Sequence, residues 1–344
     1  MNYIFTKILI KYSSYLKLID FPNERKMHSS SMPVVGGLSI CITVFIFFIY
    51  FFLTGFFNDI FKIFEIGALV LSSSIIIITG LIDDRFGLGP FNKFLFQLIS
   101  ALIFLIGLNI NHTIIFVFLD NNVLHFLVNV FFIVGIINAF NLIDGLDGLA
   151  GGVSLIIAIT FMILNFLSGS SSIEIYSSAI IIGCLFSFLI FNKSPAKTFL
   201  GDTGSLFLGW YFAVNSIYFA ERTALSLSIL LPFMILGLPA FDVLFVMFKR
   251  FIKRHHYKVP FAIRLKSVFM PDNNHLHHLL IRGGISKEKT IVLLYLITII
   301  SSMIGVFFWI NQDRVSFIYG IVFILFLIFF IRLYFEMKIK SFKE

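Results

Sequence analysis

Long runs of apolar residues, separated by short polar segments, repeat along the whole chain. A transmembrane helix needs about 20 consecutive, mostly apolar residues. Ten runs approach or exceed this length: residues 34–57, 63–82, 94–110, 123–140, 149–167, 173–191, 204–219, 225–248, 290–310 and 315–335. Apolar residues follow one another without alternation in these runs, which favours helices over the strands of a membrane β-barrel. The pattern therefore predicts an all-α, polytopic membrane protein with about ten transmembrane helices.

The first 19 residues have a different pattern. Ile4, Ile8 and Tyr12 recur at the spacing of one helix face, while Lys7 and Lys11 interrupt the apolar sequence between them. A helix with separate apolar and basic faces lies at a membrane interface more readily than it crosses the bilayer. We expect a short amphipathic or poorly inserted N-terminal helix, and the pattern leaves open whether it spans the membrane.

The composition excludes a soluble globular protein. Of the 344 residues, 59% are hydrophobic and 13% are charged, whereas a soluble domain carries about 25% charged residues. Cys41 and Cys184 both lie inside apolar runs, so they predict neither a disulfide framework nor a zinc site. We expect one integral membrane domain over residues 1–344, with the basic, histidine-rich segment 249–289 as a loop within it.

The basic residues indicate the orientation of the chain. If the segment 20–33 is cytoplasmic, alternate loops and the C-terminus are cytoplasmic too, and that side carries 23 of the 26 Lys and Arg residues. Lys62, Arg222 and Arg314 remain on the other side. Because cytoplasmic loops are enriched in Lys and Arg, this assignment is strongly favoured. Anionic lipids alone would account for the basic loops, but not for the acidic residues found among them.

Five aspartates fall on the predicted cytoplasmic face, in three segments far apart in the sequence. Asp83 and Asp84 lie in ITGLIDDRFGLGP, Asp144 and Asp147 in NAFNLIDGLDGLAGG, and Asp202 in FLGDTGSLFLGW. Carboxylate oxygens are hard ligands suited to Mg²⁺ or Mn²⁺, and Mg²⁺ usually shares its site with substrate phosphates. Nearby glycines allow close approach of a phosphate to the backbone. The five aspartates therefore predict a cation-dependent phosphate site, and no nucleic-acid partner is expected.

Basic and histidine side chains accompany these carboxylates. Lys93 begins the next apolar run, where it either extends to the membrane surface or provides a point charge for phosphate. His275, His277 and His278 lack the partners of a zinc site, which favours hydrogen bonding to an anionic substrate. Asp242 lies within an apolar run, where a charge is costly; we expect it to pair with a base such as Arg250.

These segments together resemble the polyprenyl-phosphate N-acetylhexosamine-1-phosphate transferases. The resemblance extends from about residue 20 to 290 and includes, in order, DFPNERKMHSSSMPVVGG, DDRFGL, NAFNLIDGLDGLAGG, FLGDTGSLFLGW and HLHHLL. Each motif alone is weak evidence, but their occurrence together, in this order and on one predicted face, is specific. The HLHH form and the Arg25-Lys26-x-His28 step are more similar to the WecA/TagO branch than to the MraY branch.

The resemblance implies a reaction and roles for individual residues. A UDP-N-acetylhexosamine would donate its sugar 1-phosphate to undecaprenyl or another polyprenyl phosphate and release UMP, at the cytoplasmic face of a bacterial inner or plasma membrane. Mg²⁺ is the implied cofactor, with Mn²⁺ as a substitute. The implied metal ligands are Asn141 and Asp202, and the implied catalytic residues are Asp83, Asp84, His275, His277 and His278. The implied substrate-binding residues are Lys26, Arg85, Lys93, Asp144, Gly145, Leu146, Asp147 and Phe199.

Several alternatives remain open at this point. GlcNAc-1-phosphate is the default sugar because of the HLHH form, but another UDP-N-acetyl sugar or UDP-MurNAc-pentapeptide is not excluded. The stretch from Arg254 to His275 is longer than is usual in the family, and the family's sugar choice lies partly in this loop. A transporter is the main rival class, followed by a phosphotransferase acting on diacylglycerol-type alcohols. Family analogy leaves open a homodimer.

Overall fold

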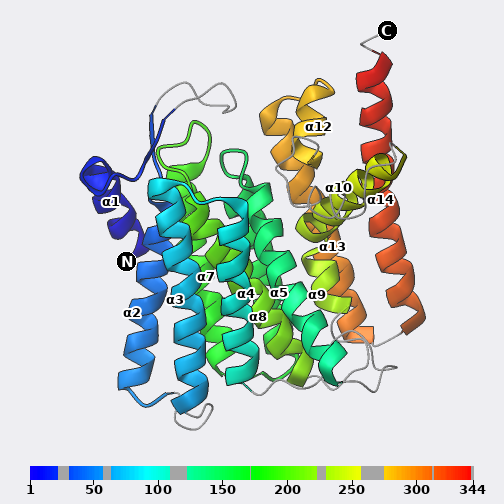
Figure 1. Cartoon of the computed structure of the whole chain (residues 1–344). Coiled ribbons are helices and arrows are strands. Elements are labelled where there is room, and N and C mark those ends of the chain that lie inside the picture. Colours follow the sequence, from blue (N-terminus) through cyan, green and yellow to red (C-terminus); the bar gives the residue numbers. More distant parts are fainter. Residues whose placement is uncertain are drawn as a thin grey trace. The chain divides into compact units, whose positions relative to one another are not determined.

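The computed structural model describes residues 1–21, 31–56, 63–108, 122–170, 172–222, 230–256, 275–311 and 314–341. These residues are almost entirely helical (Figure 1). The chain divides into two compact units, residues Met1–Leu230 and Leu231–Glu344. Each unit is described by itself, and the expectation of one domain over 1–344 stays a prediction.

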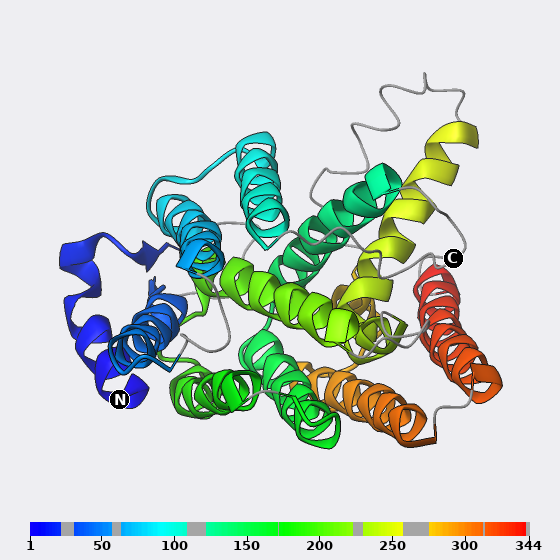
Figure 2. The same ribbon diagram turned by 90° about the horizontal axis from the view of Figure 1, so that it is seen from below.

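The first unit is a helical bundle. Its helices are α1 (Asn2–Leu16), α2 (Gly36–Leu53), α3 (Ile63–Phe86), α4 (Pro90–Gly107), α5 (Asn122–Ile143), α6 (Leu149–Leu167), α7 (Ser172–Asn192) and α8 (Gly201–Arg222). Helix α8 packs against α2, α3, α5 and α6, and the view along the bundle shows it among these neighbours (Figure 2). The core of the unit therefore forms around α8.

Eight of the ten predicted runs coincide with helices long and apolar enough to cross a membrane, within the part of the chain that the structure describes. The run 204–219 falls in α8, which is not among the eight. This helix carries buried polar residues such as Ser205, Asn215 and Ser216. Because other helices surround it, α8 does not need the continuous apolar surface that lipid contact demands.

Helix α1 is short, as the sequence predicted, but the face that it buries in the bundle is polar, and the lysines are exposed together with the predicted apolar residues. Its exposed residues include Ile4, Ile8 and Tyr12, whereas Asn2 and Thr6 are buried against α2 and α7. Asn2 Nδ2 donates to the Cys184 carbonyl at 2.9 Å, and the hydroxyls of Thr6 and Ser39 lie 2.8 Å apart. Its 15 residues extend about 22 Å, less than the roughly 30 Å of a bilayer's hydrocarbon core.

Two short strands hold the segment that precedes α8. β1 (Ile19–Asp20) pairs antiparallel with β2 (Met32–Pro33). Phe199 N donates to the Pro33 carbonyl at 2.9 Å, and Gly36 N donates to the Phe199 carbonyl at 3.0 Å. These bonds fix the entry of the chain into α8 relative to the start of α2.

Close backbone contacts also fix the first turn of α8. A Cβ atom placed on Gly37 would lie 2.1 Å from Gly204 N, and one on Gly80 would lie 2.4 Å from Thr203 Cα. Real Cβ atoms do not approach other atoms so closely, so α2 and α3 reach α8 only because these positions are glycine. The first turn of α8 is thereby held against the start of α2 and the last turns of α3.

The second unit contains α9 (Leu230–Ile235), α10 (Gly237–His256), α12 (Leu276–Arg282), α13 (Lys287–Asn311) and α14 (Arg314–Ser341). Helices α10 and α12 both pack against α13 and α14. The predicted run 225–248 is divided between α9 and α10, and the predicted loop 249–289 is helical at both ends. Residues 257–274 of that loop lie outside the described residues.

Candidate active site

All five predicted aspartates lie in the first unit, where a shared ion pair, hydrogen bonds or the electrostatic influence of one carboxylate on another connects them. They lie at the end of α3, in the turn between α5 and α6, and at the start of α8, beside the first turn of α4. Lys93 Nζ lies 2.6 Å from Asp83 Oδ2 and also forms an ion pair with Asp202. Lys93 therefore links the end of α3 to the start of α8, and the sequence-predicted base belongs to the carboxylate cluster.

Asp84 caps the N-terminus of α8 from a different helix. Its Oδ1 accepts from Asp202 N at 2.7 Å, and its Oδ2 accepts from Thr203 N at 2.9 Å and Thr203 Oγ1 at 2.6 Å. The first amides of a helix have no partner within the helix, and a carboxylate there also meets the positive end of the helix dipole. Both oxygens of Asp84 are thus engaged in holding Asp202 in place.

Gly201 makes this arrangement sterically feasible. Its φ is +72°, and a Cβ atom at this position would lie 2.3 Å from Val34 Cγ1 and 2.8 Å from both carboxylate oxygens of Asp84. Only glycine adopts such a conformation at little cost while leaving this space. The glycine of the GDTGS motif therefore allows Asp84 to reach the helix end.

Negative charge is concentrated around Asp202. The amide of Asn141 lies near Asp202, and its Nδ2 donates to Ser205 Oγ at 3.0 Å. Burial raises the pKa of Asp144 to about 8, and the negative charges of Asp202, Asp84 and Asp147 contribute to the same shift. Repulsion between neighbouring carboxylates is relieved by a proton or by a cation. The cluster thus has the electrostatic character expected of a cation-assisted phosphate site.

The turn between α5 and α6 is tied to the segment that leads to α8. Ala196 N donates to Asp147 Oδ2 at 3.2 Å, while Gly148 N donates to Asn192 Oδ1 at 2.8 Å. Asn192 Nδ2 in turn donates to the Thr198 carbonyl at 2.8 Å. Asn192 was missed from the sequence, where a single amide at the end of an apolar run is a weak signal.

The other residues predicted around this turn differ in exposure. Gly145 is exposed, Leu146 is buried and Phe199 is half-buried. Arg85 is also exposed, and its guanidinium lies 5.0 Å from the centre of the Phe86 ring. Lys26 lies outside the described residues. The roles predicted for these side chains therefore stay predictions.

The three predicted histidines belong to the second unit, so their approach to the aspartates also stays a prediction. His275 precedes α12, and its Nδ1 lies 2.9 Å from Asp242 Oδ2. Burial and the neighbouring His278 lower the pKa of His277 to about 3, so this ring is neutral at physiological pH. The histidine segment is consequently a packed structure and not a solvated loop end.

Asp242 has a different basic partner from the one predicted. Arg332 Nη1 on α14 donates to Asp242 Oδ1, and both side chains are buried. The side chain of Arg250 lies outside the described residues. Arg332 was missed because it was counted among the basic residues of the C-terminal segment. A single arginine within an apolar run was nevertheless a signal of a buried ionic contact.

The oxygen atoms of the cluster suit Mg²⁺ in chemical kind. In the described part of the chain, no three His, Cys, Asp or Glu side chains are grouped around a common metal position. Instead, the Lys93 ammonium lies between Asp83 and Asp202. Asp202 and Asn141 nevertheless place a carboxylate and an amide side by side, and both groups are hard ligands that Mg²⁺ accepts. Asp202 and Asn141 are therefore the candidate ligands of a Mg²⁺ ion.

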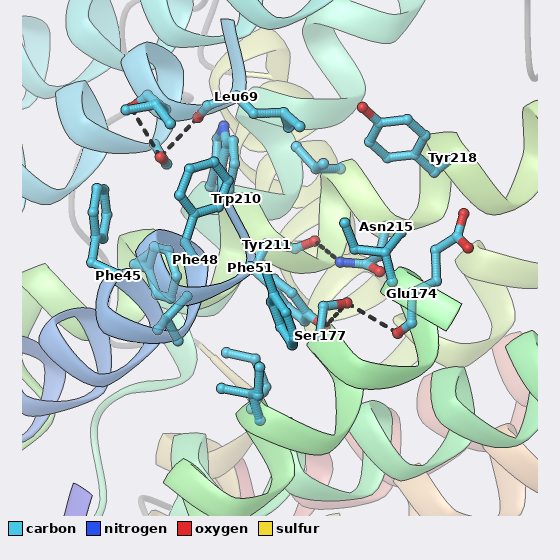
Figure 3. A pocket seen from close by; sticks show the side chains of 18 residues that line it. Phe45, Phe48, Phe51, Leu69, Glu174, Ser177, Trp210, Tyr211, Asn215 and Tyr218 are labelled. Atoms are coloured by element: carbon cyan, nitrogen blue, oxygen red, sulfur yellow. Dashed lines mark hydrogen bonds between the residues drawn. The ribbon is translucent and has the colours of Figure 1, made fainter. Parts of the chain in front are cut away.

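An apolar cavity of about 170 Å³ lies elsewhere in the same bundle, between α2, α3, α7 and α8 (Figure 3). Phe45, Phe48, Trp210 and Tyr211 are among its lining residues. On α8 these residues start at Phe207, five positions beyond Asp202. None of the predicted site residues is among its described lining residues, and its apolar walls offer little to a nucleotide.

Comparison with known proteins indicates the family to which the chain belongs. The model of glycosyl transferase family 4 matches residues 66–220, which contain all five aspartates. A probable undecaprenyl-phosphate N-acetylglucosaminyl 1-phosphate transferase of Bacillus subtilis is 33% identical over 305 residues, covering 87% of this chain and 80% of that protein.

Two more distant relatives carry similar names. An undecaprenyl-phosphate α-N-acetylglucosaminyl 1-phosphate transferase of Thermotoga maritima is 28% identical, covering 89% of this chain and 87% of that protein. A decaprenyl-phosphate N-acetylglucosaminephosphotransferase of Mycobacterium leprae is also 28% identical, covering 86% and 78% respectively. With its aspartate cluster and these matches along most of its length, the chain belongs to glycosyl transferase family 4, among the polyprenyl-phosphate N-acetylhexosamine-1-phosphate transferases.

Proposed function

We propose that this protein transfers N-acetylglucosamine 1-phosphate from UDP-N-acetylglucosamine to undecaprenyl phosphate and releases UMP. The observation that carries the proposal is the joining of Asp83, Asp84, Lys93 and Asp202 at adjoining helix ends, in a chain whose relatives have this transfer in their names. The clustering of basic residues supports a cytoplasmic location for the site, at the plasma membrane of a bacterium.

In the proposed reaction, an oxygen of the lipid phosphate attacks the sugar-bearing phosphorus of the nucleotide-sugar. One P–O bond forms as the bond to UMP breaks, and UMP leaves with the electron pair of that bond. A phosphomonoester has a second pKa of about 6, so the acceptor is largely dianionic at neutral pH and needs no strong base. Asp83 and Lys93 would then orient the reacting phosphates, while Asp84 keeps Asp202 in position.

Asp202 and Asn141 are the residues proposed to hold Mg²⁺, or Mn²⁺ in its place. When bound, the metal would neutralise negative charge on the diphosphate and on the departing UMP. Asp83 and Lys93 adjoin Asp202, which supports their placement beside the same phosphates. The ion pairs of Lys93 with two carboxylates also allow it to exchange one carboxylate partner for a phosphate oxygen.

The turn that contains Gly145, Leu146 and Asp147 is proposed to hold the uracil, with Phe199 stacked on the base. The hydrogen bond from Ala196 N to Asp147 Oδ2 and the backbone bonds of Phe199 support this placement, because they hold both segments in defined positions. The acceptor's hydrocarbon chain stays in the bilayer, since removing it would cost about 0.8 kcal/mol per CH₂ group.

The test is UMP release by the detergent-purified protein with Mg²⁺, undecaprenyl phosphate and a panel of UDP-sugars. We expect release with UDP-N-acetylglucosamine and slower or no release with UDP-glucose and UDP-MurNAc-pentapeptide. Omission of the lipid phosphate is the control, because hydrolysis of the donor would not need it. Faster release with another sugar would reassign the donor, and no release from folded protein across the panel would refute the proposed transfer.

Chelation of divalent cations is expected to abolish this release. Without a cation, the substrate diphosphate would face a cluster of aspartates compensated in the described site by Lys93 alone. The measurement compares UMP release in excess EDTA, after addition of Mg²⁺ or Mn²⁺ beyond the chelator, and after addition of Na⁺ at equal ionic strength. Restoration by either divalent cation is expected, whereas full turnover in EDTA would remove the metal from the mechanism.

A further inference from the structure

A buried ionic network joins three helices of the second unit. Asp242 on α10 is 2% exposed, and Arg332 on α14 is fully buried. Asp242 Oδ2 lies 2.9 Å from His275 Nδ1, while Oδ1 accepts from Leu276 N at 2.9 Å and from Arg332 Nη1. One carboxylate therefore holds the ring of His275, the first amide of α12 and the guanidinium of Arg332.

Stability alone does not account for this network. Burying a carboxylate and a guanidinium is costly for each ion, and apolar residues of similar volume often serve packing equally well. Arg332 also lies within a helix apolar enough to cross a membrane, where arginine is costly. Its guanidinium lies 4.4 Å from the centre of the Phe245 ring, and this cation–π contact restricts the side chain further. The arrangement thus has the rigidity expected of a device that orients another group.

The group that it orients is His275. An ionised carboxylate only accepts hydrogen bonds. His275 Nδ1 must therefore carry a proton and donate a hydrogen bond to Asp242 Oδ2. In the neutral ring, Nε2 is then left as the acceptor. Leu276 N, bonded to the same carboxylate, fixes the backbone on which the ring is mounted. Both the tautomer and the direction of His275 follow from Asp242.

We infer that Asp242 and Arg332 are positioning residues that hold His275 in its Nδ1–H tautomer and leave Nε2 as the hydrogen-bond acceptor that acts on the substrate. Arg332 keeps Asp242 ionised within the protein, and Asp242 transmits that constraint to the ring. This inference rests on the proposed function and adds to it the catalytic role that the resemblance implies for His275, namely that its ring acts on the phosphates or the sugar. A purely structural role, in which the network only ties α10, α12 and α14 together, is the competing interpretation.

The test is Asp242→Asn, which preserves shape but replaces the oxygen facing His275 with an amide donor. The amide would donate to Nδ1 and place the ring proton on Nε2. We expect kcat for UMP release to fall by about 10²–10⁴-fold, as when a histidine is held in the wrong tautomer, with little change in KM. Ring-¹⁵N NMR of histidine-labelled protein, with His275→Ala for assignment, should show the tautomer switch.

Two further comparisons separate positioning from structure. In a His275→Ala background, Asp242→Asn should lower kcat no further, because Asp242 acts through the missing ring. Arg332→Lys should retain more activity than Arg332→Met. Lys249→Gln is the matched control: Lys249 pairs with Glu336 at 2.5 Å and links the same helices α10 and α14 without contacting His275. We expect it to leave kcat unchanged.

Three results would overturn the inference: an unchanged His275 tautomer in Asp242→Asn, wild-type kcat in that variant, or additive losses in the double variant. An equal loss of kcat in Lys249→Gln would favour the structural interpretation. The NMR measurement requires no turnover, so it decides the orientation of His275 even if the wild-type protein releases no UMP. A wild-type protein that releases no UMP would refute the proposed function, and the NMR result on His275 would still stand.

Discussion

Asp202→Asn is expected to lower the kcat for UMP release by about 10²–10³-fold or more, a loss typical of removing a charge-stabilising group from an active site. The carboxylate of Asp202 forms an ion pair with Lys93, and it lies near Asn141, Asp83 and Asp144. Asparagine keeps the shape of this group and removes its charge. The variant should therefore fold while losing its ability to hold a cation and to position the diphosphate.

Glu288→Gln is the matched control for this experiment, since it also neutralises one carboxylate but at a fully exposed position. We expect its kcat and its thermal unfolding midpoint to match those of the wild-type protein. The Asp202→Asn variant should unfold within a few degrees of wild type, which makes the loss of activity interpretable. Wild-type turnover by Asp202→Asn, measured at saturating Mg²⁺ and both substrates, would exclude Asp202 from the proposed centre.

Asp84→Ala is expected to lower both stability and activity. The substitution removes the acceptor for Asp202 N, Thr203 N and Thr203 Oγ1, and an unsatisfied donor costs about 1–3 kcal/mol. Since water can reach this half-buried site, we expect the free energy of unfolding to fall by about 2–4 kcal/mol in total. Activity should fall as well, because the first turn of α8 carries Asp202. Thermal unfolding and UMP release measure the two effects.

Thr203→Val separates these contributions, because it removes one hydroxyl donor and leaves the Asp84 carboxylate in place. It should cost about 1 kcal/mol and preserve most of the turnover. A different outcome would change the role of Asp84. If Asp84→Ala unfolds like the wild-type protein but has no activity, Asp84 contacts substrate and is a catalytic residue instead of a cap for α8.

The order of the motifs was sufficient to predict which segments meet at the cluster. Helices that cross a membrane alternate in direction, so the ends that carry Asp83, Asp144 and Asp202 must lie on the same face. Sequence could not show how these carboxylates differ. Asp83 and Asp84 are adjacent, yet one pairs with Lys93 and the other caps α8. That difference depends on the rotation of α3 and on the close approach allowed by Gly80 and Gly201.

The pairing of Asp242 illustrates the same limit over a longer distance. Sequence showed that a charge in an apolar run needs a partner, because an isolated ion is costly there. It favoured a base near in sequence, whereas the partner Arg332 lies 90 positions away on α14. Many basic residues of the chain could compensate the charge of Asp242. Only the packing of the helices selects Arg332 among them.

By itself, the sequence determined the membrane class and, within the described residues, the approximate positions of eight helices long and apolar enough to span the bilayer, and it predicted that the aspartate motifs gather on one face. These properties follow from the length and continuity of apolar runs, which the bilayer's thickness makes decisive. Tertiary structure alone decided that α8 lies among other helices, that Asp84 caps it and that Arg332 holds Asp242. Such pairings depend on distances of a few ångströms between helices remote in sequence, and packing sets those distances.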